Sequence, residues 1–282
     1  MSVVFEEAAP ALSDRELNAV VQLVYQRSGI TLHDGKRALI TARLQKRLKA
    51  GGFRSFAAYL RFVEQDASGQ ELVQLLDAIA TNHTSFFREP QHFDFLREQI
   101  VPEWLGRPDR GPIELWSAAC STGEEPYTIL MTLLDALPAA DAGRVRLLAS
   151  DLSTKALATA RAGVYRLDRV QDLPPAILRR HFERGLGEQE GLARVRPALR
   201  ERVTFEQRNL LEIGAMGRPF DVIFCRNVMI YFDRAVQQRV VAALERHLAP
   251  GGYLFISHSE GLNGVTHGLQ WVAPAVYRRR LT

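Results

Sequence analysis

The 282-residue sequence has little cysteine: Cys120 and Cys225 are the only two, and their spacing is not that of metal ligands. This argues against a disulfide framework and against a zinc site. No apolar run reaches the roughly 18 residues of a membrane-spanning helix, and the N-terminus lacks the basic region and apolar core of a signal peptide. We therefore expect a cytoplasmic protein that does not insert into membranes.

Several short catalytic motifs are also missing. The chain contains no G-x-G-x-x-G, no Walker lysine, no G-x-S-x-G nucleophile elbow and no H-E-x-x-H. These absences lower the odds of a dehydrogenase, a phosphoryl-transfer enzyme, a hydrolase and a zinc peptidase. We expect no metal site.

What the chain does have is enough apolar sequence for a full core and a net charge of +4 that is unevenly spread. Its length favours one large domain plus a small one. Residues 27–54 hold eight lysines and arginines and one acid, Asp34. Such a block predicts an acidic partner, which is a nucleic acid, an anionic membrane surface or an acidic protein helix. The alternative is a solvated helix face.

The basic block lies within residues 13–80, which predict a small all-α domain of four helices. Ser13-Asp14-Arg15-Glu16 is a capping-box pattern at the first helix, and Ser68-Gly69-Gln70-Glu71 caps the fourth. The second helix fits residues 35–50. Its apolar positions lie on one side and three cations on another: Ile40, Leu44 and Leu48 against Arg43, Lys46 and Arg47.

Residues 81–90 form a polar stretch with two aromatic residues, and we expect a linker laid against other parts of the molecule. Beyond it, in residues 91–282, strands and helices alternate in a pattern typical of a doubly wound α/β sheet with seven strands. The expected elements are strand 112–117, helix 124–137, strand 144–150, helix 153–162, strand 203–207, strand 220–225, helix 234–248, strand 253–257 and a strand near 276–277.

The alternation breaks over residues 164–201. Two short strands, near His181–Arg184 and Ala193–Arg196, are joined by a glycine-rich loop. This pattern predicts a small antiparallel β-subdomain, at about residues 178–200, inserted outside the main sheet. Such insertions often carry partner specificity.

Residues 113–127 indicate a strand, a tight loop and a helix N-terminus. In an open α/β sheet, such a turn lies at the carboxyl edge, where ligands bind. Glu124 and Glu125 stand at the helix start and would repel a pyrophosphate, which favours a ligand with hydroxyl groups or positive charge.

Two further strands bring polar residues to the same edge. Asp151 follows the second strand, where a carboxylate can accept hydrogen bonds from two vicinal ribose hydroxyls. Capping of the next helix by Asp151-Leu152-Ser153 is the alternative. Arg226-Asn227 follows a later strand. Together these features predict a nucleoside pocket. S-adenosylmethionine fits it, because it carries a ribose diol and a sulfonium but no phosphate.

Four blocks then make a family resemblance clear. They are residues 81–88 (Thr81-Asn82-x-Thr84-x-Phe86-Phe87-Arg88), 116–127 (WSAACSTGEEPY), Asn209-Leu210-Leu211 and 224–232 (FCRNVMIYF). From about residue 13 to its end, the chain resembles the bacterial chemotaxis receptor glutamate O-methyltransferases, the CheR family. The resemblance implies an α-helical N-terminal domain and a methyltransferase domain with an inserted β-subdomain. It also implies methyl transfer from S-adenosylmethionine to glutamates on the cytoplasmic helices of chemoreceptors, for sensory adaptation, with S-adenosylhomocysteine as product.

The resemblance carries roles onto particular residues. The implied cofactor contacts are Asn82, Thr84, Arg88, Ala119, Glu125, Asp151, Asn209, Leu210, Arg226 and Asn227. Arg88 and Tyr231 would lie nearest the transferred methyl group and act catalytically. Two alternatives are that Arg88 only pairs with Glu89 or neighbouring acids and that Tyr231 is a core residue. The Ala118-Ala119 pair, where many relatives have a glycine, should only narrow the loop.

The resemblance also names partners. Arg43, Lys46 and Arg47 would meet the acidic methylation helix of the receptor. The loop with Gly185, Gly187 and Gly191 resembles the form that tethers some members to a receptor's C-terminal pentapeptide, added as a strand. We expect a monomer that binds no nucleic acid. Alternatives are a methyltransferase of RNA or of another signalling protein, and a non-catalytic adaptor that binds the cofactor.

Overall fold

A computed structural model describes residues 11–32, 34–80, 82–107 and 111–281. The chain divides into two compact units, residues 1–81 and 82–282. The predicted linker therefore falls in the second unit from Asn82 onward, whereas Thr81 lies outside the described residues.

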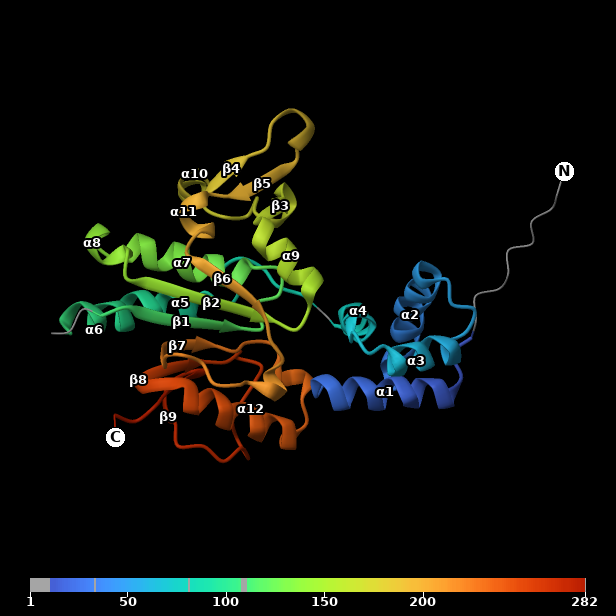
Figure 1. The fold of residues 1–282 in the computed structure, drawn as a ribbon. Helices are drawn as coiled ribbons and strands as arrows, with labels where there is room; N and C mark the ends of the chain where they lie inside the picture. Colours follow the sequence, from blue (N-terminus) through green and yellow to red (C-terminus); the bar gives the residue numbers. More distant parts are fainter. Residues whose placement is uncertain (1–10, 33, 81, 108–110, 282) are drawn as a thin grey trace. The chain divides into compact units, whose positions relative to one another are not determined.

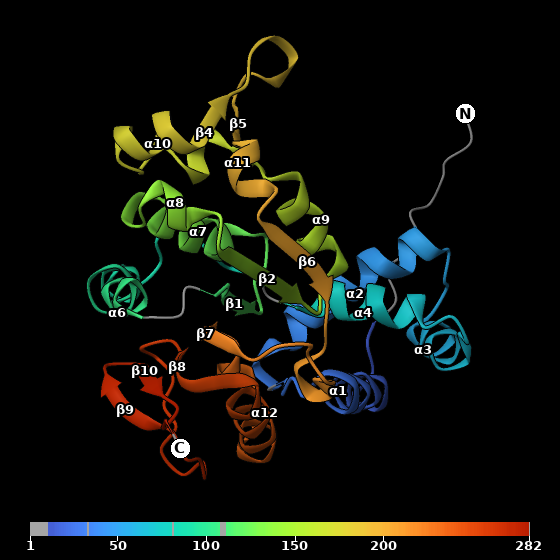
Figure 2. The same ribbon diagram turned by 60° about the vertical axis from the view of Figure 1, so that its left-hand side comes forward.

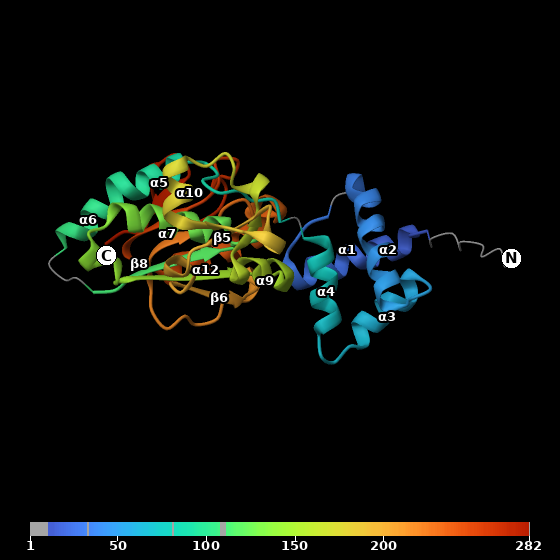
Figure 3. The same ribbon diagram turned by 90° about the horizontal axis from the view of Figure 1, so that it is seen from above.

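Within its described residues the first unit contains four α-helices, as predicted, and Figure 3 labels them α1 to α4. They are α1 Asp14–Ser28, α2 Arg37–Gly51, α3 Phe56–Gln65 and α4 Gln70–Ile79, with a short 3-10 helix at Asp34–Lys36. The predicted capping box of α1 is confirmed. The Ser13 hydroxyl accepts from the backbone N–H of Glu16, and the Glu16 carboxylate accepts from the backbone N–H of Ser13. The predicted cap of α4 is wrong in its residues. Gly69 occupies the N-cap position, and the Asp66 carboxylate accepts the N–H of Glu71 (2.8 Å) instead.

The second unit is built on the predicted seven-stranded sheet (Figures 1 and 2). The strands, in spatial order, are β6 Val203–Gln207, β2 Val145–Asp151, β1 Ile113–Ala118, β7 Phe220–Phe224, β8 Leu248–Phe255, β10 Val276–Arg278 and β9 Gln270–Ala273. The first five are parallel, while β10 runs antiparallel to both β8 and β9. Strand order reverses at β1, which pairs with β2 on one side and β7 on the other. In such sheets, this reversal point marks the ligand-binding crevice.

Helices cover both faces of this sheet. One face packs α5 Gln91–Phe95, the π-helix Leu96–Ile100, α6 Val101–Gly106 and α7 Glu124–Ala136, with α9 Thr154–Ala162 over β2 and β6. Alternate strand residues such as Leu115, Val222 and Phe224 join Tyr127 and Leu130 of α7 in one buried cluster. The helix α12, Arg234–His247, covers the opposite face, and the short α8 spans Ala139–Ala142. The apolar residues that recur every 3.6 residues in the helices and every second residue in the strands thus pack against each other in one core.

A small antiparallel sheet projects from this unit (Figure 2). Its hairpin, β4 Phe182–Arg184 and β5 Leu192–Val195, forms from the two strands predicted around the glycine-rich loop. Its third strand, β3 Val164–Arg166, lies before the predicted bounds of about 178–200. Helices and 3-10 turns flank the strands: the Leu167–Arg169 turn, α10 Pro175–His181, the Gly187–Gln189 turn and α11 Pro197–Arg200.

Candidate functional site

The loop between β1 and α7, residues 119–123, is closely packed against the end of β2. The backbone N–H groups of Ala119 and Cys120 both donate to the carbonyl of Ser150 at 2.8 Å. Gly123 has φ of +97°, and a Cβ added there would lie 2.8 Å from the Cβ of Ala160. Only glycine fits such a position. The loop therefore has a fixed shape at the carboxyl edge of the sheet.

Asp151 braces this loop. Its Oδ2 accepts the N–H of Ser121 and its Oδ1 accepts the N–H of Ser153, each at 2.8 Å. The cap of α9 is Ser153 itself, whose hydroxyl accepts the N–H of Ala156. The carboxylate is thus held between the first loop and the start of α9, and the alternative prediction, capping of α9 by residues 151–153, is confirmed with Ser153 as the N-cap.

Arg226, after β7, is a buried cation with several partners. Its guanidinium pairs with Glu125 (Nη1 to Oε2, 2.9 Å) and Glu89 (Nη2 to Oε2, 3.3 Å), donates to the carbonyl of Arg88 and lies over the ring of Phe93. Glu125 also accepts from the Ser117 hydroxyl at 2.8 Å. Burial raises the pKa of Glu125, while Arg226 and Ser117 oppose that rise. Two residues predicted to contact the cofactor are therefore partners of each other.

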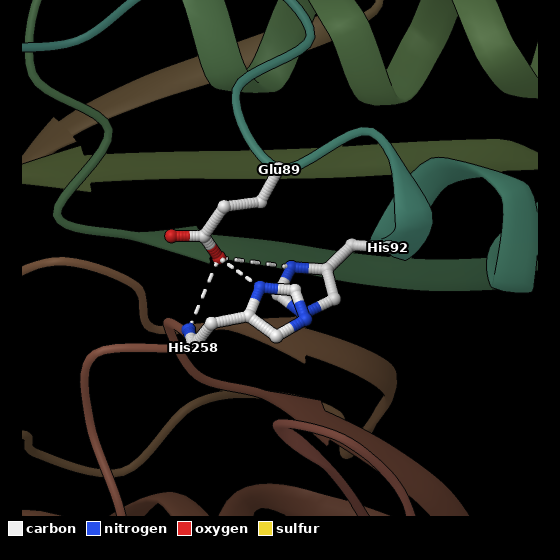
Figure 4. A group of neighbouring side chains, drawn as sticks. All are labelled: Glu89, His92 and His258. Carbon is white, nitrogen blue, oxygen red and sulfur yellow. Dashed lines mark hydrogen bonds and ion pairs between the residues drawn. The ribbon is translucent and has the colours of Figure 1, made fainter.

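Glu89 is the second anchor of this edge (Figure 4). Its carboxylate accepts from the Ser257 hydroxyl (2.7 Å), from the backbone N–H of His258 (3.2 Å) and from Nδ2 of Asn227 (3.4 Å), and it contacts Nδ1 of His258 at 3.1 Å. Burial alone would raise the pKa of Glu89, but the Ser257 hydroxyl and Arg226 hold it at about 2. The side chain is therefore an anion held by groups that follow β7 and β8.

His92 lies behind this anchor, with its ring stacked on that of His258 at 4.6 Å and 8°. Burial, with Arg226 next, lowers the pKa of His92 to about 3, so the ring is neutral. Glu89, His92 and His258 are close enough to suggest a metal centre. Metal–imidazole bonds lie in the ring plane, however, and two parallel stacked rings do not share such a point. The arrangement fits hydrogen bonding and stacking instead.

The predicted linker runs along this edge. The carbonyl of Asn82 accepts from the Ser121 hydroxyl (3.3 Å), and its amide nitrogen is 3.5 Å from the Ser153 hydroxyl. The carbonyl of Thr84 accepts from Arg169, which also pairs with Glu124 at 2.6 Å. The linker is therefore bonded to the first loop and, through Arg169, to the start of α7.

Arg88 does not take up the alternative pairing with Glu89. Its Nη1 donates to the carbonyl of His83 at 2.9 Å, while Glu89 pairs with Arg226. Tyr231 lies in the 3-10 turn Met229–Tyr231 and is half-buried, which does not fit a core residue. Glu260 contacts the chain before and within that turn, because it accepts the N–H groups of Asn227 (3.2 Å) and Ile230 (3.3 Å).

Asn209 and Leu210 lie next to Asp151. Arg208 donates its backbone N–H to the carbonyl of Asp151 at 3.0 Å, and the Asn209 side chain caps the 3-10 turn Leu210–Glu212 by accepting from Leu211. The structure thus brings the predicted residues of the second unit to one sheet edge, with Asp151, Arg226 and the linker as its fixed points.

Backbone strain is concentrated at the same edge. Non-glycine residues of the described chain with positive φ are Phe87, Glu89, Ala119, Ser121, Asn227 and Ala275. All but Ala275 belong to the linker, to the first loop or to the segment after β7. Such residues cost free energy and persist where surrounding contacts hold them, which is typical of functional sites.

Sequence reasoning missed Glu89, Ser257 and Glu260 as site residues. Glu89 directly follows Arg88, the last residue of the first family block, yet its main partners lie 168 and 169 positions away. A lone acid in a polar linker gives no sign of such partners. The signal available was the position of Ser257-His258 at the end of a predicted strand.

A groove of about 750 Å³ lies elsewhere in the second unit. Arg146 and Leu148 of β2 and Thr204 and Glu206 of β6 are among its lining residues. None of the predicted site residues lines it. The groove is therefore no part of the candidate site.

In the first unit, the cationic stripe of α2 is only partly as predicted. Arg47 binds the carboxylate of Glu71 through two hydrogen bonds of 2.5 Å. Arg43 donates to the carbonyls of Ile79 and Ala80 at the end of α4. Lys46 is exposed. Two of the three predicted docking cations therefore hold the helices of their own unit together.

Two family models match the chain in order. Residues 15–80 match the all-alpha domain of CheR methyltransferase, and residues 82–277 match the SAM binding domain of CheR methyltransferase. The chain belongs to the CheR methyltransferase family. The predicted family, fold and cofactor, S-adenosylmethionine, are thereby confirmed.

Curated CheR relatives agree with this assignment. A chemotaxis protein methyltransferase of Salmonella typhimurium is 44% identical over 95% of this chain and 91% of its own length. One from Escherichia coli is 44% identical over 90% and 86%, and chemotaxis protein methyltransferase 2 of Pseudomonas aeruginosa is 40% identical over 93% and 92%. This CheR protein is accordingly a methyltransferase of chemotaxis. Among the helices that the structure describes, none has the length and apolar character to cross a bilayer.

Proposed function

We propose that this CheR protein transfers the methyl group of S-adenosylmethionine to glutamate side chains on the cytoplasmic helices of chemoreceptors. One observation carries the proposal. The segment with Asn82, Thr84 and Arg88 is bonded across the sheet edge to the Asp151 loop, to Glu124 through Arg169 and to Arg226. These bonds support the proposal because they hold the backbone of Arg88, a cationic residue, beside the segment that follows β7.

The residues present fit the cofactor. Asp151 is held at the end of β2, where a ribose acceptor would stand, and the acids Glu124 and Glu125, each paired with an arginine, occupy the start of α7 where a phosphate would otherwise bind. We assign cofactor contacts to Asn82, Thr84, Arg88, Ala119, Glu125, Asp151, Asn209, Leu210, Arg226 and Asn227. When bound, S-adenosylmethionine supplies a methyl group activated by the sulfonium.

The chain's own residues then have a limited task. A glutamate, with an ordinary pKa of about 4.3, is already an anion at neutral pH, so no general base is needed. Arg88 holds the substrate carboxylate through a charged hydrogen bond, and Tyr231 orients it. The remaining contribution is in-line placement with water excluded. Neither Glu89 nor Glu260 serves as a base, because both carboxylates accept from backbone N–H groups.

The test is transfer of labelled methyl to receptor-containing membranes, with total RNA offered in parallel. We expect base-labile label in the receptor only. Arg88→Ala and Tyr231→Phe should each lower turnover roughly 100- to 1,000-fold, as removal of one positioned donor does. Arg97→Ala, which removes an exposed arginine of the same unit, is the matched control. Unchanged turnover in both variants would remove these residues from the chemical step, and label in RNA would favour the alternative substrate.

We propose further that the small sheet binds the receptor's C-terminal pentapeptide. The order β3-β5-β4 leaves β3 and β4 as edge strands, and the adjoining loop carries Leu186 with 82% of its surface exposed. An extended peptide added to such an edge gains main-chain hydrogen bonds. Calorimetric titration of the peptide should show binding that a Leu186→Asp variant weakens. No detectable binding to the full chain would exclude the tether.

A further inference from the structure

We infer that Glu89 is a positioning residue for methyl transfer, whose carboxylate fixes Arg88 by holding the linker against the ends of β7 and β8. The inference rests on the proposed function. It concerns a residue that does not itself touch the reacting atoms and acts through Arg88.

The backbone around Arg88 needs an external hold. Its two neighbours, Phe87 (φ +52°) and Glu89 (φ +57°), both adopt the left-handed conformation that non-glycine residues avoid. Such a pair of strained residues persists only where contacts over-determine it. Phe87 is held by one bond from its N–H to the Thr128 hydroxyl at 3.2 Å. Further contacts come from the Glu89 carboxylate, from the Arg226 bond to the Arg88 carbonyl and from the Phe93 ring against that of Phe87.

Those contacts come from two segments that are distant in sequence. Ser257 and His258 follow β8 and donate a hydroxyl and a backbone N–H to Glu89. Arg226 and Asn227 follow β7 and add a guanidinium and an amide. One carboxylate therefore ties the linker to both strand ends.

Arg226 closes the link from Glu89 to Arg88. The same guanidinium that pairs with Glu89 donates to the main-chain carbonyl of Arg88. Loss of the negative charge at Glu89 would leave Glu125 as the remaining anion paired with Arg226. The peptide between Arg88 and Glu89 would then lose both contacts that hold it, which are the ion pair of Glu89 with Arg226 and the bond from Arg226 to the Arg88 carbonyl.

The His92 ring supports the anchor from behind. It is 1% exposed and stacks on His258, so that Nδ1 of His258 faces the Glu89 carboxylate (Figure 4). Oε2 of Glu89 already has Arg226, His258 and the His258 backbone N–H around it. This crowding of donors indicates an anion that is held in place by hydrogen bonds.

The decisive experiment is a double-mutant cycle between Glu89→Gln and Arg88→Ala, read as receptor methylation by the full chain. Glu89→Gln keeps the side chain's size and removes its charge. We expect the kcat of Glu89→Gln to be lower than that of wild type by roughly 10-fold or more. Its KM for the receptor should stay within about twofold of the wild-type value. In the Arg88→Ala background, the same substitution should have almost no further effect, because coupled residues are not additive.

Two controls keep the test decisive. Glu98→Gln removes an exposed carboxylate of the same unit and should leave kcat unchanged. Should Glu89→Gln fail to fold, Ser257→Ala removes one donor to the intact carboxylate and should lower kcat in the same direction, by less. Wild-type kcat in Glu89→Gln, or fully additive losses with Arg88→Ala, would overturn the inference.

Two further outcomes have distinct meanings. Zn²⁺ binding by the wild-type chain in equilibrium dialysis, lost in Glu89→Gln, would also overturn the inference, because the carboxylate would then be a metal ligand. Absence of receptor methylation by the wild-type chain would contradict the proposed function instead.

Discussion

Arg226 joins more elements of the second unit than any sequence pattern suggests. Only 2% of its side chain is exposed, and it pairs with Glu125 of α7 and with Glu89 of the linker. Buried ion pairs add little net stability when formed, but loss of one partner leaves an uncompensated charge. Arg226 therefore has a structural role besides any contact with cofactor.

This role predicts a large effect of Arg226→Met. The variant leaves Glu125 and Glu89 without their guanidinium and should lower the free energy of unfolding by about 3–5 kcal/mol. Urea unfolding followed by circular dichroism measures it. Arg234→Met removes an exposed arginine and should stay within about 0.5 kcal/mol. Equal stability of the two variants would show that the buried pairs are dispensable.

Glu89 and His92 give the second unit a predictable acid sensitivity. The pKa of Glu89 is about 2, below its ordinary 4.5, so its stabilising effect is complete above pH 4.5 and declines as the pH falls toward 2. Burial lowers the pKa of His92 from 6.5 to about 3. Between pH 6.5 and about pH 3, His92 is protonated in the unfolded chain and neutral in the folded chain. The free energy of unfolding therefore also falls as the pH is lowered through this range. Both groups act in the same direction.

The variant His92→Phe separates the two contributions. It keeps an aromatic ring against Phe255 and removes the titrating group. We expect the loss of stability between pH 6.5 and pH 4.5 to become smaller, while the part of the loss below pH 4.5 that Glu89 causes remains. Urea unfolding at a series of pH values tests this, with the exposed His83→Asn as control. An unchanged slope above pH 4.5 would contradict the prediction.

At the scale of elements, the β1–α7 turn depends on one glycine. Alanine at position 123 would need φ of +97°, and its Cβ would meet both Ala160 and the Tyr165 hydroxyl at 2.8–2.9 Å. Gly123→Ala should therefore lower stability by about 1–3 kcal/mol and weaken cofactor affinity.

Gly143→Ala is the matched control for that prediction. This residue has negative φ and open space around its Cβ position. Its replacement should be neutral to slightly stabilising in thermal unfolding. A Gly123→Ala variant as stable as Gly143→Ala would mean that the loop adapts freely.

Elements with strong periodicity were predictable, and those set by tertiary contacts were not. The pairs β1–α7 and β2–α9 appear within a residue or two of their expected bounds, because apolar runs and glycine breaks define them. The sequence predicts a strand at 253–257, whereas β8 starts at Leu248. Pro250 and Gly251 are atypical of a strand, and the pairing of β8 with β7 shifts register between Phe220 and Val222. β3 has three residues and gave no signal of its own.

The site divides in the same way. Asp151 and Arg226-Asn227 lie at the sheet edge where the sequence predicts them, because the carboxyl ends of the parallel strands β2 and β7 share that edge. The contacts of Glu89 with Ser257 and His258 could not be predicted, because the local sequence around Glu89 carries no information about a partner so far along the chain.

At the scale of the whole molecule, the chain combines an all-α unit and a cofactor-binding unit. Among the three predicted docking cations, the hydrogen bonds of α2 distinguish the two that hold the all-α unit together from the one that is exposed. Lys46 is exposed, whereas Arg47 binds Glu71, of which only 9% of the side chain is exposed. The two neighbouring cations should therefore respond differently to substitution.

Charge reversal tests this difference. Lys46→Glu should raise the receptor KM about threefold or more, by weakening electrostatic attraction, without changing thermal stability. Arg47→Ala should instead lower the unfolding free energy by about 2–3 kcal/mol, because Glu71 loses a charged hydrogen-bond partner. Cofactor affinity should be unaffected in both variants. An altered cofactor affinity in Lys46→Glu would count against receptor docking by α2.

The long separation between Glu89 and His258 has a consequence for folding. Contacts across 169 positions are rewarded only after the intervening chain has been ordered, and closing such a loop early is entropically costly. The parallel strands β1, β2, β7 and β8 must therefore pair before the linker can lock onto their ends. A nascent or partly refolded chain would therefore contain the paired parallel strands before it contains a competent site.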